Sequence, residues 1–156
     1  MEVAGRACGG NLRTNAGSLK SPNFPGSFPD GTRCTWVITT DPGTRVSLKF
    51  FEFETEQCSS CGCDGLIIRD GKSQSATLLS KLCGSDLPSP VIASSNVMYL
   101  EFFSDSSNTG KGFKAEWSLG RIFKKIITFS CCIVGMTLLQ LYILQKKRKK
   151  MSFKVS

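Results

Sequence analysis

The sequence predicts an all-β sandwich domain followed by a single membrane-spanning helix, and three observations lead to this expectation. Before residue 120, short alternating apolar segments recur between turn-forming residues, and no window sustains the 3.6-residue period of a helix. Residues 126–144 are uncharged and largely apolar, with basic residues on both sides. Six cysteines precede residue 120, an even number that suits a disulfide-bonded domain in an oxidising compartment.

Each expected strand is a short run in which apolar and polar residues alternate. After the Asp-Pro-Gly turn, Val46, Leu48 and Phe50 would share one face of a strand. Phe51 and Phe53 would then lie on the opposite face. The expected strands are centred on Ser18–Leu19 and Leu66–Ile68 and otherwise cover Cys34–Thr40, Arg45–Phe53, Leu78–Leu82, Val91–Ala93, Val97–Phe103 and Gly112–Ser118.

The positive charge of the chain is concentrated at its C-terminal end. Residues 1–120 carry 11 Lys+Arg and 12 Asp+Glu, whereas residues 121–156 carry 9 Lys+Arg and no acid. This division argues against a nucleic-acid-binding domain and for a membrane segment with basic flanks. As a helix, residues 126–144 would span about 28 Å, close to the ~30 Å hydrocarbon core of a bilayer. The alternative is a buried core helix, but such a helix is not expected to carry basic residues at both ends.

The charge flanking residues 126–144 also predicts the orientation. Because the C-terminal flank is the more basic, we expect that end in the cytoplasm and the β domain outside the plasma membrane. The first seven residues have no apolar stretch of the kind found in signal peptides, so we expect the chain to lack an upstream exon, or else residues 126–144 to act as the insertion signal. The expected organisation is a stub at 1–7, a domain at 8–118, a juxtamembrane linker at 119–125, a transmembrane helix at 126–144 and a basic tail at 145–156.

The motifs of the first 120 residues follow a characteristic order: Cys8-Gly9-Gly10, Ser21-Pro22-Asn23-Phe24-Pro25, Cys34-Thr35-Trp36, Cys61-Gly62-Cys63-Asp64, Ile68-Arg69-Asp70-Gly71, Leu82-Cys83-Gly84 and Phe103-Ser104-Asp105. This order resembles that of a CUB domain over residues 8–117. The resemblance implies an extracellular, CUB-type jelly-roll β-sandwich. It also implies two disulfide bonds, Cys8–Cys34 and Cys61–Cys83.

Two positions depart from the family pattern, since Phe28 and Cys63 stand where the family has tyrosine. The family pairing also leaves Cys58 and Cys63 without partners, and we expect them to form an extra disulfide with each other. A metal–thiolate centre that includes Cys61 is the alternative. Zinc would need a fourth ligand there, and the chain has no histidine.

Acidic residues surround these cysteines, and Glu54, Glu56 and Asp64 are of the type that binds a hard cation. Carboxylates gathered in one place repel each other strongly unless a cation neutralises them. Solvated loop acids are the alternative reading. The resemblance implies a Ca²⁺ site whose ligands, by position, are Glu54, Asp64, Asp105, Ser107 and Asn108.

The absence of histidine excludes the Ser-His-Asp triad, Cys-His pairs and the His-Glu-x-x-His zinc motif, so we expect no enzymatic activity. The expected function is a membrane-tethered module that binds an extracellular protein in a Ca²⁺-dependent way, as a receptor, co-receptor or adhesion component. In the family, a basic side chain of the partner reaches the acids of the cation site. The alternative is an accessory CUB fragment or isoform of a larger protease. A carbohydrate-binding CUB domain is a further rival, which the membrane segment disfavours.

Overall fold

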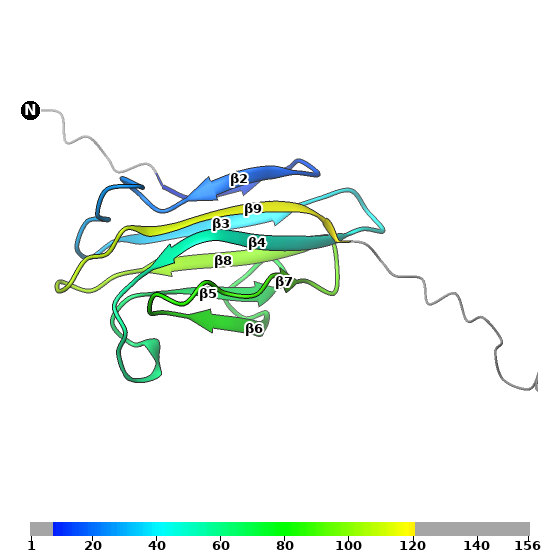
Figure 1. Ribbon diagram of the computed structural model, residues 1–156. Helices are drawn as coiled ribbons and strands as arrows, with labels where there is room; N and C mark the ends of the chain where they lie inside the picture. Colours follow the sequence, from blue (N-terminus) through cyan, green and yellow to red (C-terminus); the bar gives the residue numbers. More distant parts are fainter. Residues whose placement is uncertain (1–7, 121–156) are drawn as a thin grey trace, which may run out of the picture. The chain divides into compact units, whose positions relative to one another are not determined.

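The computed structural model describes residues 8–120, which form two β-sheets packed face to face (Figure 1). One short 3-10 helix, η1, lies between the fourth and fifth strands. The elements are β1 Gly10–Leu12, β2 Gly17–Lys20, β3 Arg33–Thr39, β4 Arg45–Glu54, η1 Ser59–Cys61, β5 Gly65–Asp70, β6 Thr77–Leu82, β7 Val91–Ile92, β8 Val97–Phe103 and β9 Gly112–Gly120.

The two sheets have the connectivity of a jelly roll. The five-stranded sheet has the order β1-β3-β8-β5-β6, and the four-stranded sheet has the order β2-β9-β4-β7. Neighbouring strands are mostly distant in sequence, as in the antiparallel pairs β3–β8 and β2–β9. The expected all-β jelly-roll sandwich is therefore confirmed.

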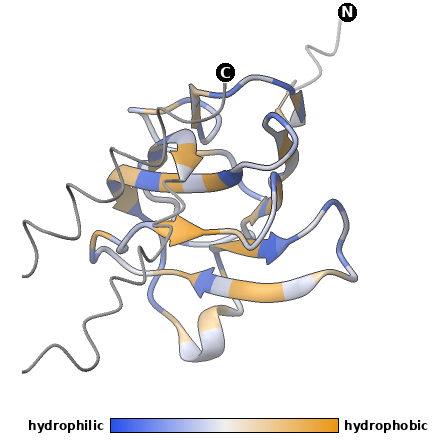
Figure 2. Cartoon of the chain, turned by 90° about the vertical axis from the view of Figure 1, so that its right-hand side faces the viewer, coloured by the Kyte–Doolittle hydropathy of each residue, from blue (hydrophilic) through white to orange (hydrophobic). Residues whose placement is uncertain are grey.

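The core lies between the sheets and is rich in aromatic side chains. The ring of Phe28 packs edge-on against Phe102 with centroids 5.1 Å apart, and Trp36 packs the same way against Phe113 at 5.9 Å. Edge-to-face pairs of this kind add to the free energy gained by burial. Figure 2 shows the alternation that builds this core as hydrophobic and hydrophilic bands along the strands.

A β-bulge in β4 changes which residues face the core. Phe50 lies opposite Ala115 and Glu52 opposite Lys114, so Phe51 is an extra residue without a partner. A bulge resets the alternation of a strand, because two residues on one strand then oppose one on the other. Phe51 is 43% exposed whereas Phe53 is only 6% exposed. The prediction that Phe53 shares the outer face with Phe51 was wrong for this reason.

Strand β1 was not expected from the sequence, because three residues carry no alternation that can be recognised. It pairs in parallel with β3, next to the disulfide that joins Cys8 to Cys34. Gly9 has a φ of +97°, and a side chain there would collide with the carbonyl of Thr35. Glycine thus allows the backbone to approach β3 closely enough for pairing.

Three loops that are far apart in sequence meet at one end of the sandwich, on the left in Figure 1. The β2–β3 loop contacts the β8–β9 loop through Phe28 N–H to Gly110 O at 3.1 Å and Gly31 N–H to Asp105 O at 2.7 Å. The β4–β5 loop joins the β8–β9 loop through Asp64, whose Oδ1 accepts the backbone N–H of Asp105 at 3.0 Å. The candidate site lies among these loops.

The predicted membrane helix and its flanks, residues 121–156, lie outside the described residues, as does the stub at 1–7. Within residues 8–120, no helix has both the length and the apolar character needed to cross a membrane.

Candidate metal centre

Two disulfide bonds shape the β4–β5 loop. Cys61 is bonded to Cys83, immediately after β6, so the loop is tied to the five-stranded sheet. Cys58 is bonded to Cys63 and closes a small ring around η1. With Cys8–Cys34, these are the pairs that were expected from the family resemblance and from the two cysteines it left over.

The side chain of Asp64 lies fully buried beneath the loops. Its Oδ1 accepts a hydrogen bond from the backbone N–H of Asp105 at 3.0 Å, and its Oδ2 accepts one from the backbone N–H of Glu56 at 3.4 Å. Burial raises the pKa of the Asp64 carboxyl, and these two backbone donors oppose that rise. Asp64 therefore holds together the two loops that carry Glu56 and Asp105.

Above Asp64, three groups of metal-ligating type converge. A carboxylate oxygen of Glu56, the Sγ of Cys63 and a carboxylate oxygen of Asp105 all lie within 4.8 Å of one another. Asn108 donates from its amide to Glu56 Oε1 at 2.7 Å. Ser107 donates to Asp105 Oδ1 through both its backbone N–H, at 2.8 Å, and its hydroxyl, at 2.9 Å.

One oxygen of this group has no partner. Glu56 Oε2 is buried, and among residues 8–120 no donor reaches it. A buried carboxylate oxygen without a hydrogen bond is costly, and a bound cation would remove that cost. The carboxylate oxygens of Glu56 and Asp105 are ligands of the kind that Ca²⁺ prefers, and waters would complete its six to eight ligands. The residues present thus fit a calcium ion.

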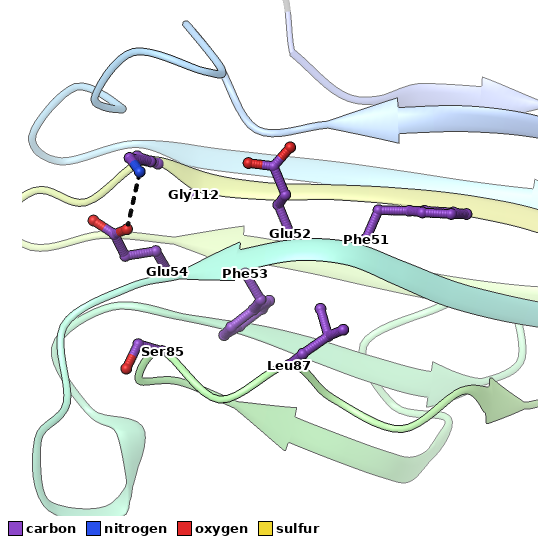
Figure 3. Close-up of a pocket in the computed structure, with 8 residues that line it drawn as sticks. Phe51, Glu52, Phe53, Glu54, Ser85, Leu87 and Gly112 are labelled. Carbon is purple, nitrogen blue, oxygen red and sulfur yellow. Dashed lines mark ion pairs between the residues drawn. The ribbon is translucent and has the colours of Figure 1, made fainter.

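Glu54, by contrast, is not among the groups that converge there. It forms an ion pair with Lys111 at 3.8 Å, and both side chains are largely exposed. It lines a shallow pocket of about 250 Å³ on the outer face, together with Phe51 and Leu87 (Figure 3). Of the five expected ligands, Asp105 lies in the converging group with Glu56. Ser107 and Asn108 hydrogen-bond to the carboxylates of that group, and Asp64 binds its backbone.

The family resemblance predicted Glu54 by its position at the end of the strand, whereas in the structure Glu56 converges with Asp105. Both are glutamates in the same Glu-Thr-Glu stretch, and the choice depends on the direction in which the chain leaves β4. Thr55 is buried and exchanges hydrogen bonds with Gly84, so Glu54 before it faces the outer side. The two family tyrosines are replaced by the buried ring of Phe28 and by Cys63 in its disulfide.

The fold and this acidic cluster define a disulfide-bonded jelly-roll module with a candidate cation site at one end. The model of the CUB domain family matches residues 8–117. Tolloid-like protein 1 of Mus musculus is 42% identical over 111 residues, which is 71% of this chain and 11% of that protein. Cubilin of Homo sapiens is 41% identical over 125 residues, covering 77% and 4% respectively. The chain therefore belongs to the CUB domain family.

Solved structures agree with this assignment. The chain is similar to the CUB1-EGF-CUB2 domains of rat MASP-1, with a TM-score of 0.65 and 27% identity over 73% of this chain and 43% of that one. It is also similar to the MASP-1 CUB2 domain bound to Ca²⁺, with a TM-score of 0.61 and 28% identity over 71% of this chain and 99% of that one. CUB domains are non-catalytic modules, and the chain spans only a small part of the length of tolloid-like protein 1 and cubilin.

Proposed function

We propose that this chain is a membrane-tethered CUB module that binds an extracellular protein through a site organised by Ca²⁺. The observation that carries the proposal is the convergence of Glu56 and Asp105 next to the buried Asp64, where Glu56 Oε2 has no hydrogen-bond donor among residues 8–120. The Ca²⁺-bound MASP-1 CUB2 domain, to which this chain is similar, supports the choice of cation.

In this proposal Glu56 and Asp105 are the charged ligands that reach the ion. Each oxygen of Asp64 accepts one backbone N–H, which leaves lone pairs that can face a cation. Ser107 and Asn108 supply neutral oxygens from the same loop as Asp105. Glu54 is not a ligand, because its carboxylate pairs with Lys111 on the outer face.

A cation in this position would prepare the surface for a basic partner. It fixes the carboxylates in one arrangement and cancels their mutual repulsion, which leaves oriented oxygens at the rim. A lysine or arginine side chain of the partner would make charge-assisted hydrogen bonds to those oxygens. The module itself is non-catalytic, and we propose no enzymatic activity for the chain.

The tether rests on the sequence. Residues 126–144 would cross the plasma membrane once, with the CUB domain outside and the basic tail in the cytoplasm. The alternative is an accessory module of a larger protein such as a protease, and the far greater length of the relatives favours it. The transcript upstream of Met1 would decide between them, since a catalytic domain encoded there would support the alternative.

The cation site is tested by comparing Glu56→Gln with Glu54→Gln in the full chain kept in detergent. Both substitutions remove one carboxylate and preserve side-chain size, so they form a matched pair. We expect Ca²⁺ to raise the melting temperature of the parent chain and of Glu54→Gln, but not of Glu56→Gln. A loss of the Ca²⁺ effect in Glu54→Gln alone would contradict the assignment of Glu56. A parent chain that does not respond to Ca²⁺ would contradict the cation site altogether.

A further inference from the structure

The sulfur of Cys63 lies inside the candidate metal centre. Its Sγ is within 4.8 Å of carboxylate oxygens of both Glu56 and Asp105, although it is bonded to Cys58. A disulfide sulfur is a poor ligand, whereas a thiolate at the same place would bind a metal strongly. The centre therefore holds a potential ligand that the disulfide bond conceals.

Breaking this bond would leave the rest of the framework intact. Cys58 and Cys63 are separated by 5 residues, against 22 for Cys61 and Cys83 and 26 for Cys8 and Cys34. Without the small ring, the loop is still tied to the sheet through Cys61. Asp64 also still holds the backbone of Glu56 and Asp105 through its two hydrogen bonds.

We propose that Cys63 is a latent thiolate ligand, so that the state of the Cys58–Cys63 bond decides which cation the centre binds. With the bond formed, only oxygens are offered and the centre takes Ca²⁺. With the bond reduced, Cys63, Glu56 and Asp105 offer one sulfur and two carboxylates, and the centre takes a thiophilic divalent cation such as Zn²⁺ or Cd²⁺. The statement that the oxidised centre binds Ca²⁺ rests on the proposed function. The statement that reduced Cys63 binds a thiophilic cation rests on the position of its sulfur.

The reductant is a dithiol. One of its thiolates attacks Cys58 Sγ, the Cys58–Cys63 bond breaks, and Cys63 leaves as a thiolate. The second thiolate of the dithiol then displaces Cys58 and closes the dithiol into its own disulfide. Two electrons have passed to the protein. Cys58 takes up a proton, and Cys63 either takes up a proton or binds the metal, in which case its proton stays in solvent.

The change of cation follows from the ligand types. Calcium binds hard oxygen ligands at flexible distances, and sulfur contributes little to it. Zinc and cadmium favour thiolate, and zinc sites with three protein ligands keep a fourth position for water. Glu56 Oε2, an atom of the same cluster, is buried without a hydrogen-bond donor among residues 8–120, which favours a bound cation in either state of the disulfide.

Two variants of the full chain in detergent test the proposal, each with one cysteine of the pair removed. Cys58→Ser frees the Cys63 thiol inside the centre, and Cys63→Ser frees the Cys58 thiol outside it. Both keep Cys131 and Cys132, so the difference between them isolates Cys63. Cd²⁺ is titrated in Ca²⁺-free buffer, and the ultraviolet absorption of the Cd²⁺–thiolate bond is followed. Peptide mapping verifies that the other two disulfides persist.

We expect one Cd²⁺ per chain to bind Cys58→Ser, with a gain in affinity of at least roughly tenfold over Cys63→Ser. Even a group that only supports a metal ligand contributes a factor of that size. Adding Glu56→Gln to Cys58→Ser should remove that gain. The parent chain with its disulfides intact should show no more absorption than Cys63→Ser. Equal Cd²⁺ binding by Cys58→Ser and Cys63→Ser would overturn the proposal, because the location of Cys63 in the centre would then give it no advantage in binding the metal.

A second measurement avoids any folding defect of the variants. The parent chain is reduced briefly with a dithiol, the dithiol is removed, and the chain is alkylated with and without Cd²⁺ before the labelled peptides are identified by mass spectrometry. We expect Cd²⁺ to protect Cys63 and leave Cys58 reactive. Equal labelling of both residues in Cd²⁺ would overturn the proposal. The Ca²⁺ response of the oxidised chain is recorded separately, so its absence would contradict the calcium site while the Cd²⁺ result still decides the role of Cys63.

Discussion

The carboxylate of Asp64 accepts the backbone N–H of Asp105 at 3.0 Å, across 41 residues of sequence. Its other oxygen accepts the N–H of Glu56, so one buried side chain positions both loops of the candidate metal centre. Asp64 directly precedes β5, whose residues Leu66 and Ile68 are fully buried. Asp64 thus links the centre to the hydrophobic core.

Removing the Asp64 side chain should destabilise the domain even without a cation. Asp64→Ala leaves two backbone N–H groups without an acceptor, and each buried donor of this kind costs about 1–3 kcal/mol. Asp105→Ala is the control, because within the described part of the chain its Oδ1 accepts only from Ser107 in the same exposed turn. Urea unfolding in chelator should show the larger loss of free energy of unfolding for Asp64→Ala. Equal losses would mean that Asp64 does not join the two loops.

Calcium should stabilise the folded chain, because an ion bound by Glu56 and Asp105 has no preformed site in the unfolded chain. The gain is about 2.7 kcal/mol at a hundred times the dissociation constant. For a domain of this size the melting temperature should rise by roughly 10 °C between excess chelator and saturating Ca²⁺. Asp105→Ala should abolish the rise.

The stability of the parent chain and of Asp105→Ala in chelator provides a second test of the cation site. Asp105→Ala without Ca²⁺ should be no less stable than the parent chain without Ca²⁺, because one like charge near Glu56 and Asp64 has been removed. That comparison separates a metal ligand from an acid that supports the fold. A melting temperature unchanged by chelator in the parent chain would show that this module does not bind the cation.

The bulge in β4 predicts opposite outcomes for two neighbouring phenylalanines. Phe53→Ala removes a buried ring that packs edge-on against Phe50, with centroids 5.7 Å apart, and should cost about 3–5 kcal/mol of stability. Phe51→Ala removes a ring that is 43% exposed and should cost far less. Denaturant unfolding of the two variants makes the comparison. Similar costs would indicate that the alternation continues through β4 without a bulge.

The Cys8–Cys34 and Cys58–Cys63 disulfides should differ in their contribution to stability. On the loop-entropy model, Cys8–Cys34 contributes about 3–4 kcal/mol and the small Cys58–Cys63 ring about 2 kcal/mol. Cys34 is also buried in the core. Cys34→Ser should therefore abolish export of the domain, whereas Cys58→Ser should be exported. Efficient export of Cys34→Ser would show that this bond is dispensable for folding.

The orientation in the membrane can be tested on cells. With a signal peptide supplied, an epitope at the N-terminus should be accessible to antibody on intact cells. An epitope after residue 156 should become accessible only after permeabilisation. The unequal basic flanks of residues 126–144 are the reason for this expectation. An N-terminal epitope protected in intact cells would contradict it.

Much of the fold could be predicted because apolar alternation is a local signal. The segment Val97–Phe103 places Met98, Leu100 and Phe102 on one face, and all three are fully buried in β8. Strand β1 escaped prediction because its three residues form a strand only through pairing with β3. Its position depends on the Cys8–Cys34 bond and on Gly9, which are contacts with a distant segment.

The sequence by itself determined the all-β class, the CUB family and the acids available for a cation site. Only the tertiary structure decided which glutamate joins Asp64 and Asp105. One extra residue at Phe51 turns Phe53 inward, and the bonds between Thr55 and Gly84 then direct Glu54 outward and carry the chain on to Glu56. The physical reason is that the alternation of β4 is fixed by its pairing with β9 and β7, and a single sequence does not state that register.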